Sequence, residues 1–139
     1  YESVVPGMKI IYDAAYTLLA HSQAALVTSG TATLETAAIG TPQVVCYRAN
    51  GSKLSYKLFE HILKVRFVSL PNLIADKEVV PELLLHLCNP DNIAAHLAPL
   101  LNDSAERRAM LDGYKTVRQR LGSNDSAETA ARQLIADLK

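Results

Sequence analysis

Residues 24–47 read AALVTSGTATLETAAIGTPQVVCY, and this stretch decides the fold class. Its first run, residues 24–27, is short and apolar, and its last run, residues 43–47, is rich in the β-branched side chains that favour strands. Between them, residues 33–39 have helical character and end at Gly40, a residue that readily takes the left-handed conformation of a helix C-terminus. Strand, helix and strand in this order, with strands that are apolar throughout, are typical of a parallel sheet covered on both faces.

Further segments extend this pattern toward both ends of the chain. Residues 9–12 and 65–68 are short apolar runs with strand character, and residues 14–20 and 52–64 carry apolar side chains at helical spacing. Beyond Pro81 we expect no more strands. The segments predicted there as helices are residues 82–87, 91–101, 105–121 and 127–138. The sequence therefore predicts an α/β fold in which helices flank a parallel sheet, followed by a helical C-terminal tail.

Length and composition exclude several classes of protein. The chain has 139 residues, of which 49% are apolar, so it can bury the core of one globular domain and is not disordered. Its 14 Lys and Arg balance its 14 Asp and Glu, which argues against a general nucleic-acid-binding protein. No apolar run approaches the roughly 18 residues of a membrane span. The chain opens on Tyr1 without an initiator Met or a signal segment, so we expect it to be part of something larger.

The two cysteines, Cys46 and Cys88, stand alone in the sequence. Neither belongs to a CxxC pair or lies at zinc-ligand spacing from a histidine, so they are poor material for a zinc site or a disulfide framework. This cysteine usage favours a reducing cytosol as the setting of the protein. Cys46 is most simply a buried strand residue.

The turn after the first predicted strand, Ser29-Gly30-Thr31-Ala32, is the strongest candidate for a binding site. The first amides of a helix have no intrahelical partner and the helix dipole is positive there, so a phosphate or diphosphate fits this position. Glu35 lies about one helical turn further along and could accept hydrogen bonds from the paired hydroxyls of a ribose. The alternative is a capping box, which the pattern alone favours because short Ser/Gly/Thr turns are common. The turn matches neither the Walker loop nor the GxGxxG fingerprint.

Four blocks of sequence together carry a resemblance to a known family. They are SGTATLE at residues 29–35, GTPQVV at residues 40–45 with Tyr47-Arg48, VSLPN at residues 68–72, and EVVPELL at residues 78–84. In this order and spacing they resemble the C-terminal half of the lipid-A-disaccharide synthase family, from about Met8 to the C-terminal helices. Four ordered blocks are much more specific than one, so the resemblance favours the phosphate-binding turn over the capping box.

The resemblance implies a glycosyltransferase of the GT-B type, which is built from two Rossmann-like domains. The family transfers 2,3-diacylglucosamine from its UDP carrier to 2,3-diacylglucosamine 1-phosphate, and the products are the β-1,6-linked lipid A disaccharide and UDP. In this architecture the C-terminal domain binds the nucleotide sugar, whereas the N-terminal domain supplies much of the acceptor pocket and the general base. The resemblance thus implies no catalytic residue in this chain, which would be inactive alone. It also implies no metal and no cofactor, since the UDP-sugar is a substrate.

The resemblance also implies roles for individual residues. Ser29, Gly30, Thr31, Ala32 and Arg48 would bind the diphosphate of UDP, and Glu35, Asn72 and Glu82 would bind the ribose or another part of the nucleotide. Structural alternatives stay open: a surface salt bridge for Arg48, a turn cap for Asn72, and for Glu82 an acid in the first turn of a helix, where it suits the dipole. Leu85 departs from the family, because many relatives have Gln at this position.

The domain organisation expected from the resemblance has two parts. Residues 1–103 form the Rossmann-like nucleotide-sugar-binding domain, and residues 104–139 are helices that pack on the missing N-terminal domain or on a second subunit of a homodimer. The alternative is a terminal helix packed on its own domain. Residues 43–70 hold five cations against one acid, so the helix predicted over residues 52–64 could lie on an anionic membrane, although an ordinary sheet-covering helix is favoured. We therefore expect a cytoplasmic protein with access to the inner face of the inner membrane.

Two other functions stay open at this point. Another UDP-sugar enzyme of GT-B architecture, such as a UDP-N-acetylglucosamine 2-epimerase, would have a similar sheet and phosphate turn, but it would leave the blocks at residues 69–72 and 78–84 without an explanation. A non-catalytic α/β binding or oligomerisation module is the alternative from a different class. That module predicts no stabilisation of the chain by UDP.

Overall fold

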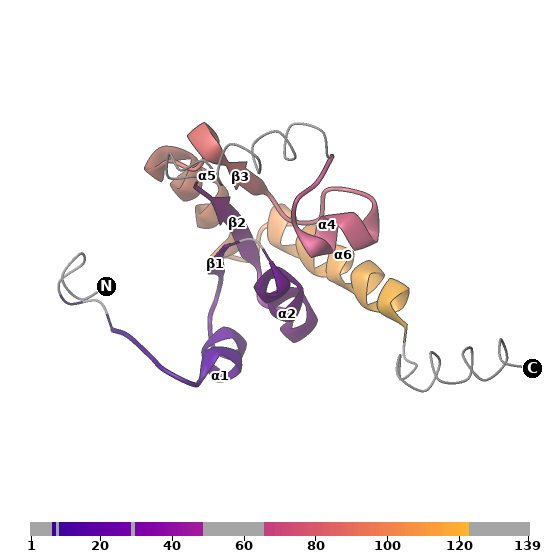
Figure 1. Cartoon of the computed structure of the whole chain (residues 1–139), viewed down its shortest axis with the longest axis horizontal. Helices are drawn as coiled ribbons and strands as arrows, with labels where there is room; N and C mark the ends of the chain where they lie inside the picture. The colour runs from indigo at the N-terminus through magenta and orange to yellow at the C-terminus, as the bar shows by residue number, and fades with distance from the viewer. Residues whose placement is uncertain (1–6, 8, 29, 49–65, 123–139) are drawn as a thin grey trace, which may run out of the picture.

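The computed structural model describes residues 7, 9–28, 30–48 and 66–122, and every structural statement below concerns these ranges. Figure 1 shows how the elements are arranged, and its labels are used here. In chain order the elements are α1 (Ala15–Ala20), β1 (Ala25–Thr28), α2 (Thr31–Ile39), β2 (Gln43–Tyr47), α4 (Leu70–Ala75), β3 (Glu82–Leu84), the 3-10 turn η1 (Leu85–Leu87), α5 (Pro90–Leu100) and α6 (Ala105–Leu121).

The three strands form a parallel sheet in the order β1–β2–β3. Val44 in the central strand lies opposite Leu26 of β1, and the next residue, Val45, lies opposite Glu82 of β3. The predicted α/β, Rossmann-like architecture is therefore confirmed. Because all three strands run in one direction, their carboxyl ends meet at one edge of the sheet, which is where open α/β folds bind ligands.

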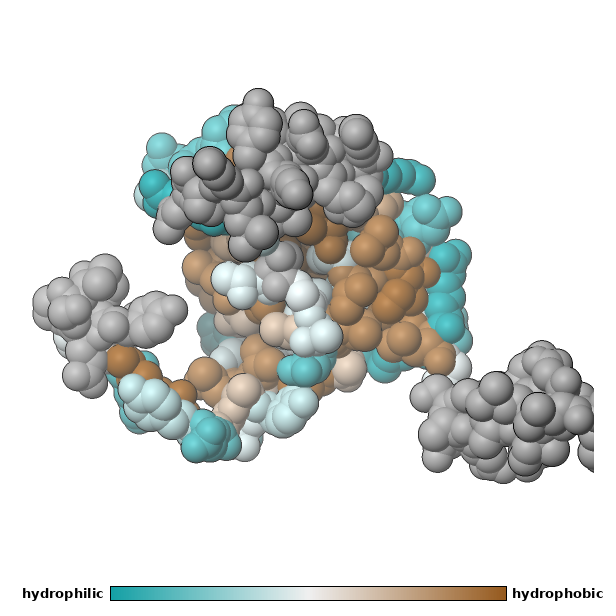
Figure 2. Space-filling view, viewed as in Figure 1, coloured by the Kyte–Doolittle hydropathy of each residue, from teal (hydrophilic) through white to brown (hydrophobic). Residues whose placement is uncertain are grey.

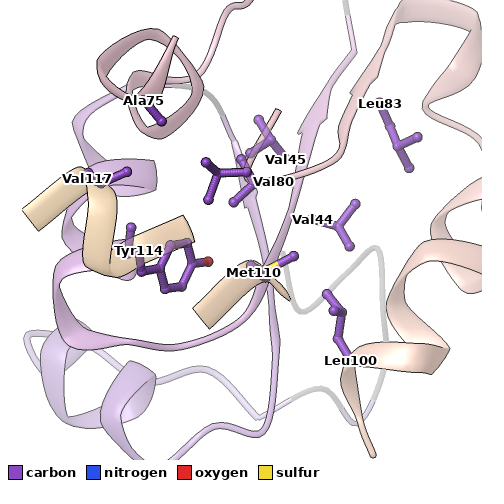
Figure 3. Packing of buried hydrophobic residues seen from close by; sticks show 11 residues of the cluster. Val44, Val45, Ala75, Val80, Leu83, Leu100, Met110, Tyr114 and Val117 are labelled. Carbon is purple, nitrogen blue, oxygen red and sulfur yellow. The ribbon is translucent and has the colours of Figure 1, made fainter. Parts of the chain in front are cut away.

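Helices pack on both faces of the central strand, as the unbroken apolar character of its sequence predicts. Figure 3 shows Val44 on the side of Leu100, the last residue of α5, whereas Val45 lies on the side of Met110 and Tyr114 of α6. Val44, Val45 and Tyr114 are completely buried. Successive residues of a strand point to opposite faces, so one strand here contributes to both layers of the core.

Helix α6 packs on the sheet through three buried side chains, Met110, Tyr114 and Val117, which follow the helical spacing expected from the sequence. The Tyr114 hydroxyl donates to the carbonyl of Thr41 at 3.1 Å and accepts from Nε2 of Gln43 at 3.2 Å. Burial raises the pKa of this phenol above its ordinary range. Residues 105–121 therefore belong to the core of this sheet. The predicted boundary between residues 103 and 104 stays a prediction, because residues 123–139 lie outside the described ranges.

The last turns of α6 also contact the ends of two other helices. Nη1 of Arg118 donates to the carbonyl of Ala37 in α2 at 3.2 Å, and Nη1 of Arg120 donates to the carbonyl of Ile74 in α4 at 2.8 Å. Carbonyls in the last turn of a helix lack intrahelical partners, and cations are favoured there by the helix dipole. The two arginines therefore join α2 and α4 to α6 at their C-terminal ends.

Several predicted elements are confirmed close to their predicted ends. These are the helices α1, α2, α5 and α6 and the strands β1 and β2. α2 ends at Gly40, which has a φ of 96° and donates its N–H to the carbonyl of Thr36, as expected for a left-handed C-terminal cap. The helices predicted over residues 52–64 and 127–138 lie outside the described residues. Within the described part of the chain, no helix has the length and apolar character needed to cross a membrane.

The segment after Pro81 is not the helix predicted over residues 82–87. Glu82–Leu84 form strand β3, because their backbone pairs with β2, and Leu85–Leu87 form a single 3-10 turn. Leu85 has a φ of 55°, a left-handed conformation that a right-handed helix does not contain. The expectation that strands stop beyond Pro81 is therefore wrong, and the reason is that pairing with a neighbouring strand outweighs local helix propensity.

Two short runs predicted as strands are not strands in the described residues. Residues 9–12 and 66–68 have no regular secondary structure. The N–H of Val68 donates to Oε2 of Glu82 at 2.9 Å, so a side chain takes the place of a neighbouring strand as its partner. An apolar run of three or four residues becomes a strand only where another strand lies beside it.

Candidate functional site

The site predicted from the sequence begins where β1 ends and α2 starts. Gly30 is the N-cap residue of α2 and has a φ of 124° and a ψ of −162°, a combination that glycine adopts far more readily than other residues. Gly30, Thr31 and Ala32 are all exposed, and no side chain of the described residues caps the helix. Ser29 lies outside the described residues. With a glycine at the N-cap, the capping-box alternative lacks the side-chain oxygen that it requires.

Hydrogen bonds from two buried threonines hold the first turn of α2 in place. Oγ1 of Thr33 donates to the carbonyl of Gly30 at 2.7 Å, and Oγ1 of Thr36 donates to the carbonyl of Ala32 at the same distance. The carbonyl of Thr33 in turn accepts from Nε2 of the buried Gln43 at 2.9 Å. The turn is therefore anchored from inside the protein, while none of the described side chains caps its outer surface.

Thr33 and Gln43 are residues that the sequence reasoning missed as supports of this turn. A threonine three residues after a glycine N-cap gives a weak local signal, because Thr side chains often bond to a nearby carbonyl. Gln43 gives a stronger one, since a long polar residue inside an otherwise apolar strand must find partners when it is buried. Its Nε2 has two partners, whereas its Oε1 is buried without a protein partner among the described residues.

Glu35 and Arg48 lie near the same edge of the sheet. Glu35 follows Thr31 by four residues in α2, which places both on one side of the helix, and Glu35 is half-buried. Arg48 directly follows the carboxyl end of β2 and is exposed. None of the ion pairs between described residues includes Arg48, so the surface salt bridge considered for it is not seen there.

Arg48 also lines a pocket of about 410 Å³ at the carboxyl edge of the sheet. The other lining residues come from the turn after β3 and from the start of α5, and they are Leu85, His86, Cys88, Asn89 and Pro90. Leu85 has the positive φ described above, and strained residues of this kind are concentrated in binding sites. The pocket and the start of α2 both lie past the carboxyl ends of the strands.

Asn72 is completely buried and uses all of its side-chain hydrogen-bonding groups inside the protein. Its Oδ1 accepts from the N–H groups of Val79 at 2.7 Å and Val80 at 2.9 Å. Its Nδ2 donates to the carbonyl of Val80 at 2.9 Å and to Oε1 of Glu82 at 2.8 Å. These contacts match the turn-cap alternative for Asn72, because no donor or acceptor of the side chain is left for a ligand.

Glu82 lies on strand β3, whereas the sequence suggested that it lies in the first turn of a helix. Its Oε1 accepts from the N–H of Ser69 at 2.9 Å and from Oγ of Ser69 at 2.6 Å, and its Oε2 accepts from the N–H of Val68. Ser69 is the N-cap residue of α4, so the carboxylate lies at the positive end of a different helix from the one predicted. Asn72 and Glu82 together fix the chain between β3 and the start of α4.

A second and larger pocket, of about 590 Å³, lies at the opposite edge of the sheet. It is lined by the segment before β3, the end of α5 and the first turns of α6 (Lys77–Pro81, Ala95, His96, Pro99, Leu100, Glu106, Ala109, Met110 and Gly113). Since ligands of open α/β sheets bind at the carboxyl edge, this pocket is not the predicted site. Among the described residues, no three His, Cys, Asp or Glu side chains gather as they would around a metal ion.

Comparison with known proteins gives one consistent result. Residues 7–136 match the family model described as lipid-A-disaccharide synthetase. The lipid-A-disaccharide synthase of Syntrophus aciditrophicus is 39% identical over 134 residues, which are 96% of this chain and 34% of that protein. The corresponding proteins of Rhodospirillum centenum and Pseudomonas aeruginosa are 38% identical over 87% of this chain and 36% identical over 92%, and the matches cover 30% and 33% of those proteins. The chain thus spans about a third of the length of the curated relatives it matches.

Proposed function

This chain belongs to the lipid-A-disaccharide synthase family, and from that premise we propose that it is the UDP-sugar-binding half of a glycosyltransferase. The reaction proposed for the complete enzyme transfers 2,3-diacylglucosamine from its UDP carrier to 2,3-diacylglucosamine 1-phosphate. Its products are lipid A disaccharide and UDP. The observation that carries the proposal for this chain is the exposed start of α2 at the carboxyl edge of β1, which no side chain of the described residues caps.

The diphosphate of UDP is proposed to bind at this start. Backbone N–H groups of Gly30, Thr31 and Ala32, with Ser29, would donate to the phosphate oxygens, and the positive end of the α2 dipole favours their charge. Arg48 would supply a second, charge-assisted contact from the end of β2. Donors that are fixed before the reaction stabilise the negative charge that develops on the departing diphosphate, which is the role that a metal ion has in other transferases.

Glu35 is proposed to accept hydrogen bonds from the ribose hydroxyls, since it lies one turn along α2 from the phosphate site. For Asn72 and Glu82 we propose a positioning role in place of contact with the nucleotide. Their hydrogen bonds to each other and to Ser69 fix the start of α4 and the short segment between Arg66 and this helix. In this proposal Asn72 and Glu82 therefore act on the nucleotide site only through the backbone that they hold, and not by touching the nucleotide.

The chemical step is proposed to be a direct displacement at the anomeric carbon by the 6-hydroxyl of the acceptor, with inversion of configuration. The base that removes the proton of this hydroxyl is assigned to the N-terminal half of the enzyme, so we name no catalytic base among the residues of this chain. The part of this chain is to bind the donor, orient its anomeric carbon and stabilise UDP as it leaves.

Three partners belong to the proposal: an N-terminal domain of the same enzyme, a second copy of the chain through the C-terminal helices, and an anionic membrane surface from the cytoplasmic side. Figure 2 shows apolar surface across much of the face that carries α2 and α4. Leu73 of α4 is 50% exposed. The basic stretch of residues 43–70 supports the membrane contact, since both substrates are acylated and the inner leaflet is anionic.

Titration of the chain with UDP, followed by calorimetry and by thermal shift, tests the nucleotide site. We expect weak binding by the wild-type chain, because half of the cleft is absent. Arg48→Ala is expected to weaken it by roughly tenfold, the value of one charge-assisted hydrogen bond, and Glu35→Ala is expected to weaken it as well. Arg108→Ala is the matched control, since Arg108 is an exposed arginine that pairs with Asp103.

The absence of heat and of a thermal shift at millimolar UDP would remove the support for this site and leave a non-catalytic binding module as the better description. Equal weakening by Arg48→Ala and Arg108→Ala would show a general effect of charge instead of a specific contact. Disaccharide formation is expected only after the N-terminal half is added, and turnover by the chain alone would contradict the proposed division of labour.

A further inference from the structure

The peptide between Gly30 and Thr31 carries one of the N–H groups of the proposed phosphate site. Gly30 has a φ of 124° and a ψ of −162°, and the backbone of a glycine turns more freely than that of any other residue. Rotation about this ψ angle swings the whole peptide and so changes the direction of the Thr31 N–H. A contact that holds the peptide therefore decides where this N–H points.

The hydroxyl of Thr33 makes such a contact. Thr33 is completely buried, and its Oγ1 donates to the carbonyl of Gly30 at 2.7 Å, whereas the N–H of Thr33 donates to the same carbonyl at 3.2 Å. A trans peptide is planar, and its C=O and N–H groups point in opposite directions. Because the Gly30 carbonyl is held toward the buried hydroxyl, the N–H of Thr31 points away from the helix, to the side on which the phosphate is proposed to bind.

Thr33 is itself held by the sheet. Its carbonyl accepts from Nε2 of Gln43 at 2.9 Å, and the same Nε2 donates to the hydroxyl of Tyr114 at 3.2 Å. Gln43 belongs to β2 and Tyr114 to α6, and both are completely buried. The hydroxyl that holds the first peptide of α2 is therefore fixed to the core of the protein.

Thr36 makes a similar bond that acts on a different kind of peptide. Its Oγ1 donates to the carbonyl of Ala32 at 2.7 Å, and this residue is also buried. The N–H in that peptide belongs to Thr33, and it already donates to the carbonyl of Gly30. The N–H of Thr31, at the first position of the helix, has no intrahelical partner. Of the two threonines, Thr33 is thus the one that acts on an N–H available to a phosphate.

We propose that Thr33 is a positioning residue for the diphosphate, because its hydroxyl sets the direction of the Thr31 N–H and with it the affinity for phosphate. The effect on affinity rests on the function proposed above, whereas the direction of the N–H does not. Thr33 does not touch the ligand, since it is buried behind the turn and acts through the Gly30 carbonyl. An N–H that points at an acceptor donates a stronger hydrogen bond than one that points past it.

Residual dipolar couplings of the backbone N–H groups, measured by NMR in a weakly aligned sample, report the direction of the Thr31 N–H without any ligand. Thr33→Val keeps the shape of the side chain and removes the donor, and Thr33→Ala is a second variant without the hydroxyl. Both are expected to change the coupling of Thr31, and Thr33→Ser, which keeps the hydroxyl, is expected to restore it. An unchanged coupling in Thr33→Val and Thr33→Ala would overturn the proposal.

Thr41→Val is the matched control for the loss of a buried hydroxyl. Oγ1 of Thr41 donates to the carbonyl of Leu19, also at 2.7 Å, and Thr41 lies beyond the other end of α2. This variant is expected to leave the coupling of Thr31 unchanged. Circular dichroism and urea denaturation show that each variant is folded under the conditions of the NMR measurement.

Titration with UDP and with inorganic diphosphate, followed by NMR, tests the effect on the ligand. Thr33→Val is expected to weaken both by roughly tenfold, as after loss of one charge-assisted hydrogen bond, whereas Thr33→Ser and Thr41→Val should bind like the wild-type chain. Equal weakening by Thr33→Val and Thr41→Val would overturn the proposal, because it would show a general effect of lost stability. Weaker binding of UDP with unchanged binding of diphosphate would also overturn it. If the wild-type chain binds neither ligand, the proposed function fails, and the dipolar couplings alone decide whether Thr33 directs this N–H.

Discussion

Replacing Asn72 with alanine distinguishes the positioning role of this residue from the ligand contact expected from the sequence. The substitution removes four hydrogen bonds at once, two to the N–H groups of Val79 and Val80 and two from the side-chain amide. The two valines are 8% and 0% exposed, so water cannot easily replace the lost partner. A buried hydrogen bond contributes about 1 kcal/mol net, and orphaned buried groups add to this loss. We expect the free energy of unfolding to fall by about 3 to 4 kcal/mol.

Urea denaturation followed by circular dichroism measures this change, and thermal unfolding should show a midpoint lower by about 10 °C. Asn92→Ala is the matched control, because the side chain of Asn92 makes one exposed hydrogen bond, to the carbonyl of Leu87 at 3.0 Å. Its cost is expected to stay below about 1 kcal/mol. Equal stability of the two variants, combined with loss of UDP binding only in Asn72→Ala, would refute the positioning role and return Asn72 to the ligand.

Three further predictions follow from the geometry. Gly30→Ala and Gly40→Ala both place alanine at a positive φ with open space around the new Cβ, so each should lower the free energy of unfolding by about 1 kcal/mol. Only Gly30→Ala should also weaken UDP binding, which titration of both variants with UDP would measure. Gly113→Ala puts a Cβ 2.5 Å from Cγ1 of Val79 and should cost about 1 to 3 kcal/mol, measured by urea denaturation; an unchanged midpoint would contradict the close packing of α6. Because burial raises the pKa of Tyr114, the folded state holds this proton more tightly than the unfolded chain, so the stability that this group contributes should be constant below about pH 10 and be lost as the pH rises further. Tyr114→Phe should flatten that alkaline decline at the cost of two buried hydrogen bonds, and an equally steep decline in both proteins would assign it to other groups.

The parts of the fold that sequence predicts well are those in which local preference and packing agree. Residues 43–47 combine β-branched side chains with an apolar face on each side, and they form the central strand. Residues 82–84 show the opposite case, because Glu and Leu favour a helix locally, but the segment lies beside β2 and pairs with it. Local propensity cannot reveal such pairing between distant segments.

The candidate site divides along the same line. The turn at Gly30 is local, and its small residues, positive φ and position before a helix can be read from a few neighbouring residues. The contacts of Asn72 and Glu82 are not local in this sense, because they join two segments across ten residues and through side-chain atoms. Their residue types suit a nucleotide site and an internal cap equally well, and only coordinates separate the two roles.

Helix α2 is held from behind at both of its ends. Arg118 of α6 donates to the Ala37 carbonyl near the last turn, which Gly40 closes, and Gln43 of β2 donates to the Thr33 carbonyl in the first turn. A shift of α6 or β2 would therefore change the direction of the N–H groups of the proposed site without any change in the residues of the turn. Because these contacts hold the nine residues of α2 in place before a ligand arrives, we expect little conformational entropy to be lost on binding.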